Sequence, residues 1–495
     1  MNEYSSRQFL LDDQPGTLFP LRTSTVLAER AFDPILDYVY RCVLKTEDTE
    51  HRFLSQLRCY SSKHGFHCRR TMRLDPVAEQ FIYDLVYRNR HTFRRDHSPS
   101  RRSYGYRFEN SRPVSVSAGY SAFRAAVAAA RSEYQFSAKC DIAAYFNSLY
   151  HHDLVAWFED EGRSAEDGRA FGQFLREINA GRSVDCLPHG IYPSKVIGSQ
   201  FLKFIDNSIR LRSALLIRFM DDLYWFDDDE ATVLTDFVTI QRMLGEKGLS
   251  VNSEKTSIGA VAVANVPQTI DEIKASLLQI RRRIVDVSGF EFEIEGEEEV
   301  SLSLEQIRYL LNLLRDPEIT EQDAELVLVL LRERGGDVLP QMGTFLDRFP
   351  SLGRNLYSFC RFVDDKPRIA EIVYDFLNRS THVTEDQLFW ITKTAEQFLL
   401  DVPRVRDILR MLYDHSNATP LTHAKLLEIP DTRYGLSDLR HEHLRTGASE
   451  WRTWAAAVGC SAEAPAKRNY ALGYFANGGP VNRLIADCVR GLSDT

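Results

Sequence analysis

The chain has 495 residues, of which 44% are hydrophobic and 26% charged, a balance typical of a soluble globular protein with two or three domains. It has no secretory signal and no apolar run long enough to span a bilayer, so we expect a cytoplasmic location and no membrane partner. The eight cysteines are scattered without a Cys-x-x-Cys pair, which argues against a zinc site or a disulfide framework.

Charge is unevenly distributed along the chain. The formal net charge is −9, but residues 1–130 carry +6 and the remainder −15. Phosphate binding needs a local basic surface, not a basic protein. The net acidity therefore does not exclude a nucleic-acid partner.

The N-terminal part combines predicted helices with a basic cluster. Residues 1–85 are predicted to be mostly helical, with amphipathic stretches such as 32–40. Residues 88–113 contain eight arginines with aromatic residues between them, a mixture suited to phosphates and stacked bases. The alternative is a solvated loop or hairpin with incidental charge. The last of these arginines begins a predicted strand, 111–116. The cluster comprises Arg88, Arg90, Arg94, Arg95, Arg101, Arg102, Arg107 and Arg112, with Tyr104, Tyr106 and Phe108 between them.

Two stretches in the middle of the chain place polar residues at element boundaries. After an Ala-rich helix predicted at 122–134, residues 136–146 predict a strand that delivers Asp141. An Asp in this position is often only a helix N-cap. Residues 187–194 then place Pro, Gly and Ser before a helical run. They could be ordinary loop chemistry, or they could let the backbone approach a nucleotide closely.

The stretch 215–226 places two adjacent carboxylates, Asp221 and Asp222, between two short apolar runs. Each run predicts a strand, so the carboxylates would lie at a hairpin turn. Like charges repel, and a divalent cation bound by carboxylate oxygens removes that repulsion. The alternative is that acidic residues simply favour turns.

The elements around this hairpin predict the fold of the central region. A helix near 234–244 follows it, and then a short strand with a lysine-bearing turn at 249–256. The order strand, helix, hairpin, helix, strand predicts an antiparallel sheet with helices on one face.

The pattern changes after an exposed acidic hairpin predicted at 290–300. Beyond it the periodicity is helical without a strict repeat, which predicts an irregular stack of helical hairpins. Ser303-x-x-Gln306 and Thr384-x-x-Gln387 are predicted capping boxes. His441 and His443 are expected to be surface features, because residues two apart do not share a helical face.

Taken together, the central motifs resemble the palm of reverse transcriptases over about residues 86–260. The stretch 141–146 is similar to the first carboxylate motif of that family. Leu187-Pro-His-Gly190 is similar to its Leu-Pro-Gln-Gly stretch, and residues 219–222 are similar to its aromatic-x-Asp-Asp motif. Residues 249–256 are similar to the lysine motif that comes next in that family. Residues 112–114, before the first carboxylate motif, are similar to the finger strand whose arginine contacts the triphosphate. The order and spacing of these motifs are more specific than any one of them.

The resemblance implies an α+β fold, with fingers and an antiparallel palm followed by an all-α C-terminal domain of helical hairpins. We place N-terminal helices and fingers at 1–115, the palm at 116–287, an acidic linker at 288–302 and the helical domain at 303–495. The implied enzyme is a nucleotidyltransferase that adds dNTPs to DNA with two Mg²⁺ ions, or Mn²⁺ in their place.

The resemblance also assigns roles to individual residues. The implied metal ligands are Asp141, Asp221, the Ile142 carbonyl and, more weakly, Asp222. Lys255 is either an acid for the pyrophosphate leaving group or an electrostatic stabiliser. The implied nucleotide-binding residues are Arg107 and Arg112 on the triphosphate, Phe146 against the sugar, and His189, Gly190 and Ser194 beside the template–nucleotide pair.

Within that family, the chain is most similar to the AbiK-like abortive-infection (Abi) reverse transcriptases, which are bacterial and defence-associated. This similarity rests on Tyr150-His151-His152, on His-Gly-Ile at 189–191 and on the helical C-terminal region. It implies antiphage defence by a cytoplasmic homo-oligomer that synthesises single-stranded DNA on its own tyrosine without a template. His189 in place of glutamine, together with Pro193, argues against ordinary template copying. The tyrosine candidates, chosen by position alone, are Tyr4, Tyr38, Tyr40 and Tyr60.

Two other functions remain open. The same fold could use a noncoding RNA as template, as some defence-associated relatives do. Alternatively, the palm could be inactive and serve as an oligomeric scaffold or phage sensor. The carboxylates at 141, 221 and 222 argue against this last function.

Overall fold

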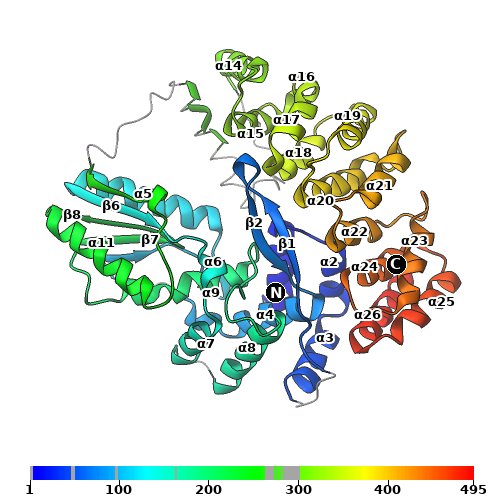
Figure 1. The fold of residues 1–495 in the computed structure, drawn as a ribbon, viewed down its shortest axis with the longest axis horizontal. Coiled ribbons are helices and arrows are strands. Elements are labelled where there is room, and N and C mark those ends of the chain that lie inside the picture. The colour runs from blue at the N-terminus through cyan, green and yellow to red at the C-terminus, as the bar shows by residue number, and fades with distance from the viewer. Residues whose placement is uncertain are drawn as a thin grey trace. The chain divides into compact units, whose positions relative to one another are not determined.

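The structure is a computed structural model that describes residues 4–45, 51–94, 98–161, 164–261 and 302–494, with 273–274, 276–278 and 280–281 between the last two ranges. The hairpin predicted at 290–300 lies outside these residues. Internal contacts divide the chain into two units (Figure 1). The first unit comprises residues 1–18, 36–57 and 71–270, and the second comprises 19–35, 58–70 and 271–495. No helix of the described residues is long and apolar enough to cross a membrane.

The first unit contains a five-stranded sheet in the order β3-β7-β8-β6-β9. All neighbouring pairs are antiparallel except β3 with β7. The predicted strand at 136 and the predicted hairpin at 215–226 are confirmed. The strands are β3 (Arg101–Ser103), β6 (Phe136–Asp141), β7 (Leu215–Phe219), β8 (Asp222–Asp227) and β9 (Ser257–Ala260).

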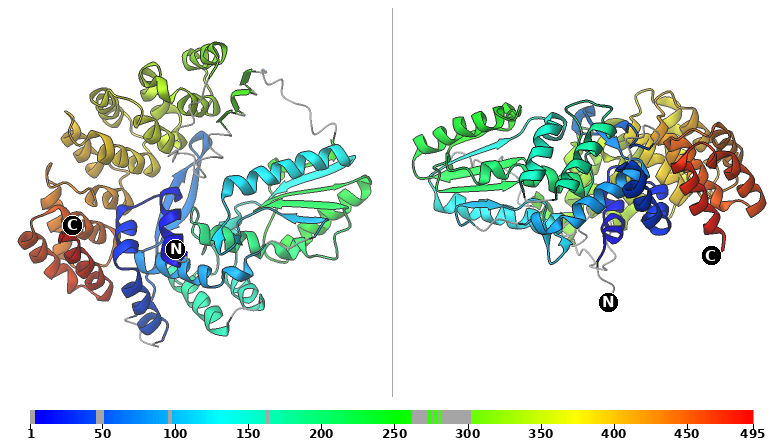
Figure 2. Two further views of the ribbon diagram at one scale, coloured as in Figure 1. Left: turned by 180° about the vertical axis from the view of Figure 1, so that it is seen from behind. Right: turned by 90° about the horizontal axis from the view of Figure 1, so that it is seen from below.

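Helices α5 (Val116–Glu133) and α11 (Glu230–Gly245) cover opposite faces of this sheet (Figure 2, right). Tyr224 of β8 packs against Phe123 of α5, with ring centroids 5.5 Å apart. The next residue, Trp225, stacks on Phe237 of α11 at 6.0 Å. Successive strand side chains point to opposite faces, so the prediction of helices on one face is wrong. Both β8 faces carry large apolar residues, and both need a cover.

A β-hairpin was missed in the N-terminal region, which we had predicted to be mostly helical. It pairs β1 (Leu57–Ser62) with β2 (Cys68–Arg73), and Gly65 between them has a left-handed φ of 65°. The two strands contain one β-branched residue, Thr71, so their local propensity for strand is weak. The predicted strand at 111–116 shortens to β5 (Arg112–Pro113), paired with β4 (Phe108–Glu109), because α5 already begins at Val116.

Helices and short turns complete the first unit. They are α1 (Ser6–Asp13), η1 (Gln14–Gly16), η2 (Val39–Val43), α4 (Pro76–Arg88), η4 (Arg90–Thr92), α6 (Tyr145–Ser148), α7 (His151–Asp160), α8 (Ala165–Ile178), α9 (Tyr192–Phe201), α10 (Lys203–Asp206) and η5 (Ser253–Lys255), with α3 (Phe32–Tyr38) at the boundary.

The second unit is a stack of helices in which several pack against the next but one, as in α18–α20, α20–α22 and α22–α24, while others, such as α25 and α26, pack against their neighbour in the chain. The described C-terminal region is all helical, as predicted, and both predicted capping boxes are present. Its longer elements are α14 (Leu304–Arg315), α15 (Glu321–Leu330), α17 (Met342–Arg348), α18 (Gly353–Cys360), α19 (Lys366–Arg379), α20 (Glu385–Thr394), η9 (Ala395–Leu399), α21 (Val405–Asp414), α22 (Pro420–Leu427), α23 (Leu436–Thr446), α24 (Trp451–Gly459), α25 (Pro465–Ala476) and α26 (Pro480–Arg490).

Helix α2 (Arg22–Arg30) belongs to this helical unit, although we had placed it with the fingers. The buried carboxylate of Glu428 accepts the backbone N–H groups of Arg22 (2.9 Å) and Thr23 (2.8 Å). It also pairs with Lys425, at 2.7 Å. First-turn N–H groups of a helix have no partner within it, and here the partner lies more than 400 positions away. The four predicted segments therefore do not coincide with the two units.

A buried acid at the start of α20 gives the helical unit a pH-dependent stability. Burial, and then the neighbouring Glu385, raise the pKa of Asp386 to about 8, while Arg354 acts in the opposite direction. Between pH 4 and 8 the folded state binds more protons here than the unfolded state, so this group lowers stability as pH rises, by at most about 1.4 kcal/mol per pH unit. We expect Asp386→Asn to raise the melting temperature over wild type more at pH 8 than at pH 5. The exposed Asp364→Asn serves as control, and an equal gain at both pH values would contradict the prediction.

Candidate active site

Three carboxylates gather at one end of the sheet. Asp141 ends β6 and Asp222 begins β8, and the two are direct partners in the antiparallel register. Asp221 lies in the turn between β7 and β8, next to Met220, which adopts a left-handed φ of 55°. Like charges directly opposite one another destabilise a sheet, so this pair of carboxylates lowers the local stability of the fold.

The same repulsion contributes to raised pKa values in the cluster. Burial, followed by the charges of Asp141 and Asp222, raises the pKa of Asp221 to about 6, with Lys255 acting in the opposite direction. Burial also raises the pKa of Asp222, partly offset by Lys139. Perturbed carboxyl groups of this kind are typical of functional sites.

A lysine from the stretch 249–256 joins the cluster. Lys255 Nζ lies 3.0 Å from Asp141 Oδ2, although its side chain remains 60% exposed. The segment is held by backbone pairing, since the Asn252 N–H donates to the Asp141 carbonyl at 2.7 Å. Ile142 faces Val251 in an isolated antiparallel bridge whose hydrogen bonds come from the flanking residues. Its own carbonyl therefore takes no part in this pairing.

This donor set suits a divalent cation. Hard cations bind carboxylate and carbonyl oxygens, and the predicted ligands Asp141, Ile142, Asp221 and Asp222 offer both. The ammonium of Lys255 already lies against Asp141, so the cluster attracts positive charge. These residues fit the metal role that the sequence predicts for them, and that role stays a prediction.

The hairpin turn is held by an arginine for which we had predicted no role. Arg218 of β7 is fully buried and donates to the carbonyls of Met220 (3.0 Å) and Ser199 (2.9 Å). Its guanidinium also pairs with Asp206 of α10. A buried charge needs such partners, and here they fix the backbone beside Asp221 to α9 and α10.

Phe146 and His189 lie together near this cluster's first strand. Phe146, on α6 directly after β6, is half-buried, and its ring centroid lies 4.8 Å from that of His189. His189 also contacts Asn147 through Nε2, at 3.2 Å from Oδ1. On the facing helix α9, a Cβ added at Gly198 would lie 3.3 Å from Phe146 Cζ. The glycine allows the close packing that sets the position of the Phe146 ring.

The loop that carries His189 is anchored from the N-terminal region. The His189 N–H donates to the Thr71 hydroxyl at 2.7 Å. Gly190 has a φ of 90°, and a Cβ there would lie 2.5 Å from Leu18 Cγ. The Tyr192 N–H donates to the buried Asp13 carboxylate at 2.7 Å. Ser194, predicted to touch the nucleotide, is fully buried on α9.

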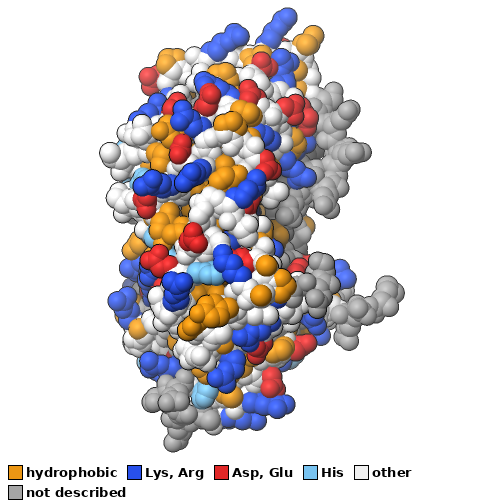
Figure 3. Space-filling model, turned by 90° about the vertical axis from the view of Figure 1, so that its right-hand side faces the viewer, with side chains coloured by type: hydrophobic (Ala, Val, Ile, Leu, Met, Phe, Trp, Pro, Cys, Tyr) orange, Lys and Arg blue, Asp and Glu red, His pale blue; other side chains and the backbone are white. Residues whose placement is uncertain are grey.

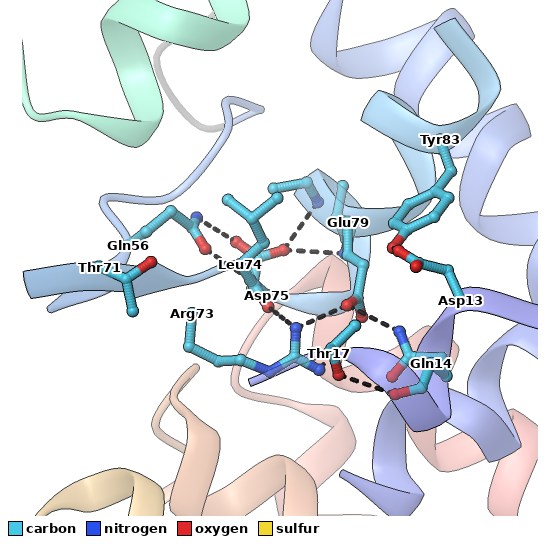
Figure 4. A network of polar contacts seen from close by, with 12 residues as sticks. Asp13, Gln14, Thr17, Gln56, Thr71, Arg73, Leu74, Asp75, Glu79 and Tyr83 are labelled. Carbon is cyan, nitrogen blue, oxygen red and sulfur yellow. Dashed lines mark hydrogen bonds and ion pairs between the residues drawn. The ribbon is translucent and has the colours of Figure 1, made fainter. Parts of the chain in front are cut away.

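Behind Thr71 lies a buried polar network (Figure 4). Arg73 pairs with Glu79 at 2.6 Å, and Gln14 donates to the same carboxylate oxygen at 2.8 Å. Asp75 caps α4 by accepting backbone N–H groups, and it also accepts from Gln56 at 2.6 Å. The network ties the end of β2 to α4 and η1, and so fixes the strand from which Thr71 reaches the His189 loop.

The two predicted triphosphate arginines differ in their surroundings. Arg107 is buried and pairs with Glu109 at 2.7 Å, and it also donates to backbone carbonyls. Arg112 is exposed on β5, with its guanidinium 5.1 Å above the Tyr4 ring. The arrangement leaves Arg112 more accessible to an anion. An open cavity of about 790 Å³ lies beside the same hairpin, lined by Arg90, His91, Arg94, Phe108, Glu109, Asn110 and Ser111.

The tyrosine candidates also differ. Tyr4 donates to Asp12 at 2.9 Å and Tyr40 to Asp84 at 2.6 Å. The Tyr38 hydroxyl lies 3.2 Å from His51 Nδ1, and burial raises the pKa of Tyr38 to about 12. Tyr60 is the most exposed of the four, at 46%.

Residues 92–310 match the protein-family model described as reverse transcriptase (RNA-dependent DNA polymerase). The chain carries a reverse transcriptase domain. The match includes all three carboxylates and Lys255, and it confirms the predicted enzyme class, a nucleotidyltransferase. The finer similarity to the Abi group stays a prediction for this chain.

Comparison with curated proteins found no match. Among solved structures, the chain is similar to apo telomerase from Candida tropicalis at 10% identity and a TM-score of 0.32, over 79% of this chain and 74% of that one. It is also similar to telomerase from Candida albicans in complex with a TWJ fragment of telomeric RNA, at 14% identity and a TM-score of 0.25, over 81% and 68% of the two chains.

The placement of Phe146 leads to a prediction about sugar selection. We expect Phe146→Ala to raise the ratio of ribonucleotide to deoxyribonucleotide incorporation by about 10-fold or more, because the ring no longer excludes the 2′-hydroxyl. The ratio of kcat/KM for GTP and dGTP measures it. Gly198→Ala, which crowds the ring, should lower incorporation without relaxing selection. Gly172→Ala on α8, where a Cβ meets only ordinary contacts at 3.5 Å, is the control. An unchanged ratio in Phe146→Ala would remove this role.

Proposed function

We propose that the chain is a Mg²⁺-dependent DNA polymerase of antiphage defence that starts synthesis on one of its own tyrosines and needs no template. The observation that carries the polymerase function is the cluster of Asp141, Asp221 and Asp222 with Lys255 at 3.0 Å from Asp141. The defence role, the protein primer and the absence of a template rest on the resemblance to the AbiK-like group. Mn²⁺ is a possible substitute for Mg²⁺.

The proposed reaction transfers a nucleotidyl group. A tyrosine oxygen, and later the 3′ oxygen of the growing strand, forms a bond to the α-phosphate of a dNTP. The bond to pyrophosphate breaks, and the attacking hydroxyl loses its proton. Two Mg²⁺ ions, when bound, would stabilise the attacking and leaving oxygens. Asp141, Asp221 and the Ile142 carbonyl would hold them, with Asp222 as a weaker ligand.

Other residues would orient the nucleotide. Phe146 would pack against the deoxyribose, and His189 would border the base from its loop on Thr71. Arg112 would bind the triphosphate by paired, charge-assisted hydrogen bonds, and Arg107 would join it on release from Glu109. Lys255 would donate a proton to pyrophosphate or stabilise its charge.

The product would be single-stranded DNA attached to the protein, and the active form would be a homo-oligomer in the bacterial cytoplasm. Residues 131–495 are acidic on balance, which disfavours a long duplex lying across them. On the face in Figure 3, acidic side chains are interspersed with basic and hydrophobic ones. A strand tethered at one end by a tyrosine needs less phosphate contact to stay bound.

Incubating the protein with Mg²⁺ and labelled dNTPs, without template or primer, tests the proposal. Label that migrates with the protein on a denaturing gel, and collapses on protease treatment, would identify a covalent adduct. Single Tyr→Phe variants at 4, 38, 40 and 60 would then show which residue primes. If the adduct is absent and synthesis appears only with an added primer and template, the proposed tyrosine priming is rejected and the proposed polymerase activity is retained.

A second function has one specific observation in its favour. The matching family model is described as an RNA-dependent DNA polymerase, so a bound noncoding RNA could be the template. Sequencing RNA that copurifies with the protein, alongside its DNA product, decides between the two. Complementary sequences would establish an RNA template.

A further inference from the structure

His441, which we expected on the surface, lies in a cluster of the helical unit, far in the chain from the palm residues. His441 is on α23. Cys460 begins the short turn η10 (Cys460–Ala462) that follows α24, and Glu463 comes directly after that turn. The His441 Nε2 atom lies 2.8 Å from Glu463 Oε2, and its side chain is only 14% exposed. Cys460 and Glu463 are buried. The prediction of a surface feature is therefore wrong for this residue.

The local backbone explains why the three side chains meet. In a 3₁₀ turn, residues three apart lie one above the other, so Cys460 and Glu463 present their side chains to the same side. The Glu463 N–H donates to the Cys460 carbonyl at 2.9 Å and closes that turn. Helix α23 packs against both α24 and α25 and brings His441 to this side. One potential ligand atom from each residue lies within 4.8 Å of the other two.

The donor types select a particular kind of ion. An imidazole nitrogen, a thiol sulfur and a carboxylate oxygen together suit zinc, which accepts all three in tetrahedral sites. Zinc bonds of about 2.0–2.3 Å place neighbouring ligand atoms roughly 3.3–3.8 Å apart, so small side-chain rotations complete the set. Among the residues that the structure describes, this is the one such group of three.

The surroundings orient the carboxylate. Ser437 donates to the other oxygen of Glu463, Oε1, at 2.6 Å, and Lys467 donates to the Ser437 hydroxyl at 2.6 Å. Hydrogen bonds of this kind to the second oxygen of a ligand are usual around bound metals. Two positive charges are near. Lys467 donates to Ser437, Arg440 donates to the carbonyls of Leu427, Ile429 and Asp431, and both charges also act on the Cys460 thiol.

We propose that His441, Cys460 and Glu463 form a zinc site with one position left for water or an external ligand. Binding would release the thiol proton, so that thiolate and carboxylate balance the charge of the ion. The site is independent of the polymerase function, and it lacks the Cys-x-x-Cys pair whose absence argued against zinc in the sequence.

Cobalt titration of the full-length protein tests the site, since Co²⁺ takes zinc positions and reports on bound thiolate through a near-ultraviolet charge-transfer band. We expect one Co²⁺ per chain to give this band and to be displaced by one Zn²⁺, while Co²⁺ on the palm carboxylates, which include no thiolate, gives no such band. Cys460→Ser should abolish the band, and Ser437→Ala should weaken affinity about 10- to 100-fold. Cys488→Ser and His443→Gln are matched controls that keep it. His443 is two residues away on the same helix and contacts Tyr413 instead, at 2.8 Å.

A second readout does not depend on how well the variants fold. X-ray absorption of the zinc-bound wild type should show one sulfur among the atoms bound to the metal. Absence of sulfur, or a charge-transfer band that persists in Cys460→Ser, would overturn the proposal. Asp221→Asn should keep the cobalt band, so loss of polymerase activity and loss of this site are separate results.

Discussion

Replacing Asp221 by Asn is expected to lower dNTP incorporation by about 10²- to 10³-fold, the scale seen when a preorganised charge-stabilising group is removed. Although the substitution lowers activity, it should not lower the stability of the folded protein. Because burial and Asp141 raise the pKa of Asp221 to about 6, its ionised form opposes folding above that pH. In EDTA at pH 8, the melting temperature of the variant should therefore equal or exceed that of wild type.

Melting temperatures with and without Mg²⁺ show whether Asp221 binds metal or only supports the fold. Adding Mg²⁺ should raise the melting temperature of wild type, since a ligand that binds only the folded state stabilises it. The rise should be smaller in Asp221→Asn. Asp228→Asn is the matched control, because this exposed carboxylate lies just beyond β8, outside the cluster, and accepts the Gln135 N–H at 3.1 Å. Full activity in Asp221→Asn would contradict the assignment.

Replacing Lys255 by Gln is expected to lower incorporation by about 10²- to 10⁴-fold, the range of a positioned general acid. The ammonium lies 3.0 Å from Asp141 Oδ2 on a largely exposed side chain, so it can move between that carboxylate and a leaving group. Single-turnover incorporation measures the chemical step without product release.

Lys255→Arg distinguishes the two roles that the sequence left open. Arginine keeps the charge but does not give up its proton at ordinary pH. Recovery to near wild-type rate in Lys255→Arg would indicate electrostatic stabilisation, and a rate as low as that of Lys255→Gln would indicate proton donation. Lys247→Gln, which breaks an ion pair with Asp153 on the surface, should leave the rate unchanged.

The parts of the site that could be predicted are those coded by neighbouring residues. Apolar runs on both sides of Asp221 and Asp222 predicted β7 and β8. The capping boxes of α14 and α20 were predictable because each is a motif of four consecutive residues. Strand β6 was predictable for the same reason, and it delivers Asp141 to the position opposite Asp222.

The supports of the site could not be predicted, because their partners are remote in sequence. The contact between His189 and Thr71 spans 118 positions, and that between Tyr192 and Asp13 spans 179. No local pattern marks Asp13 as the acceptor of a distant N–H group. The β1–β2 hairpin was missed because its strands have weak propensity for strand. The second covered face of the sheet was missed because the prediction did not use the run of aromatic residues in β8, where Tyr224 and Trp225 pack on opposite faces.

The grouping of α2 with the C-terminal helices bears on how the chain is made. Residues 22 and 23 are synthesised about 400 residues before Glu428, their acceptor. The N-terminal segments of the helical unit must therefore wait, without their final partner, until translation is nearly complete. Because the chain passes between the two units at residues 18, 35, 57, 70 and 270, a single cut near 270 does not separate them. Shortening the gene at its 3′ end, so that Glu428 is lost, should leave the start of α2 without its acceptor.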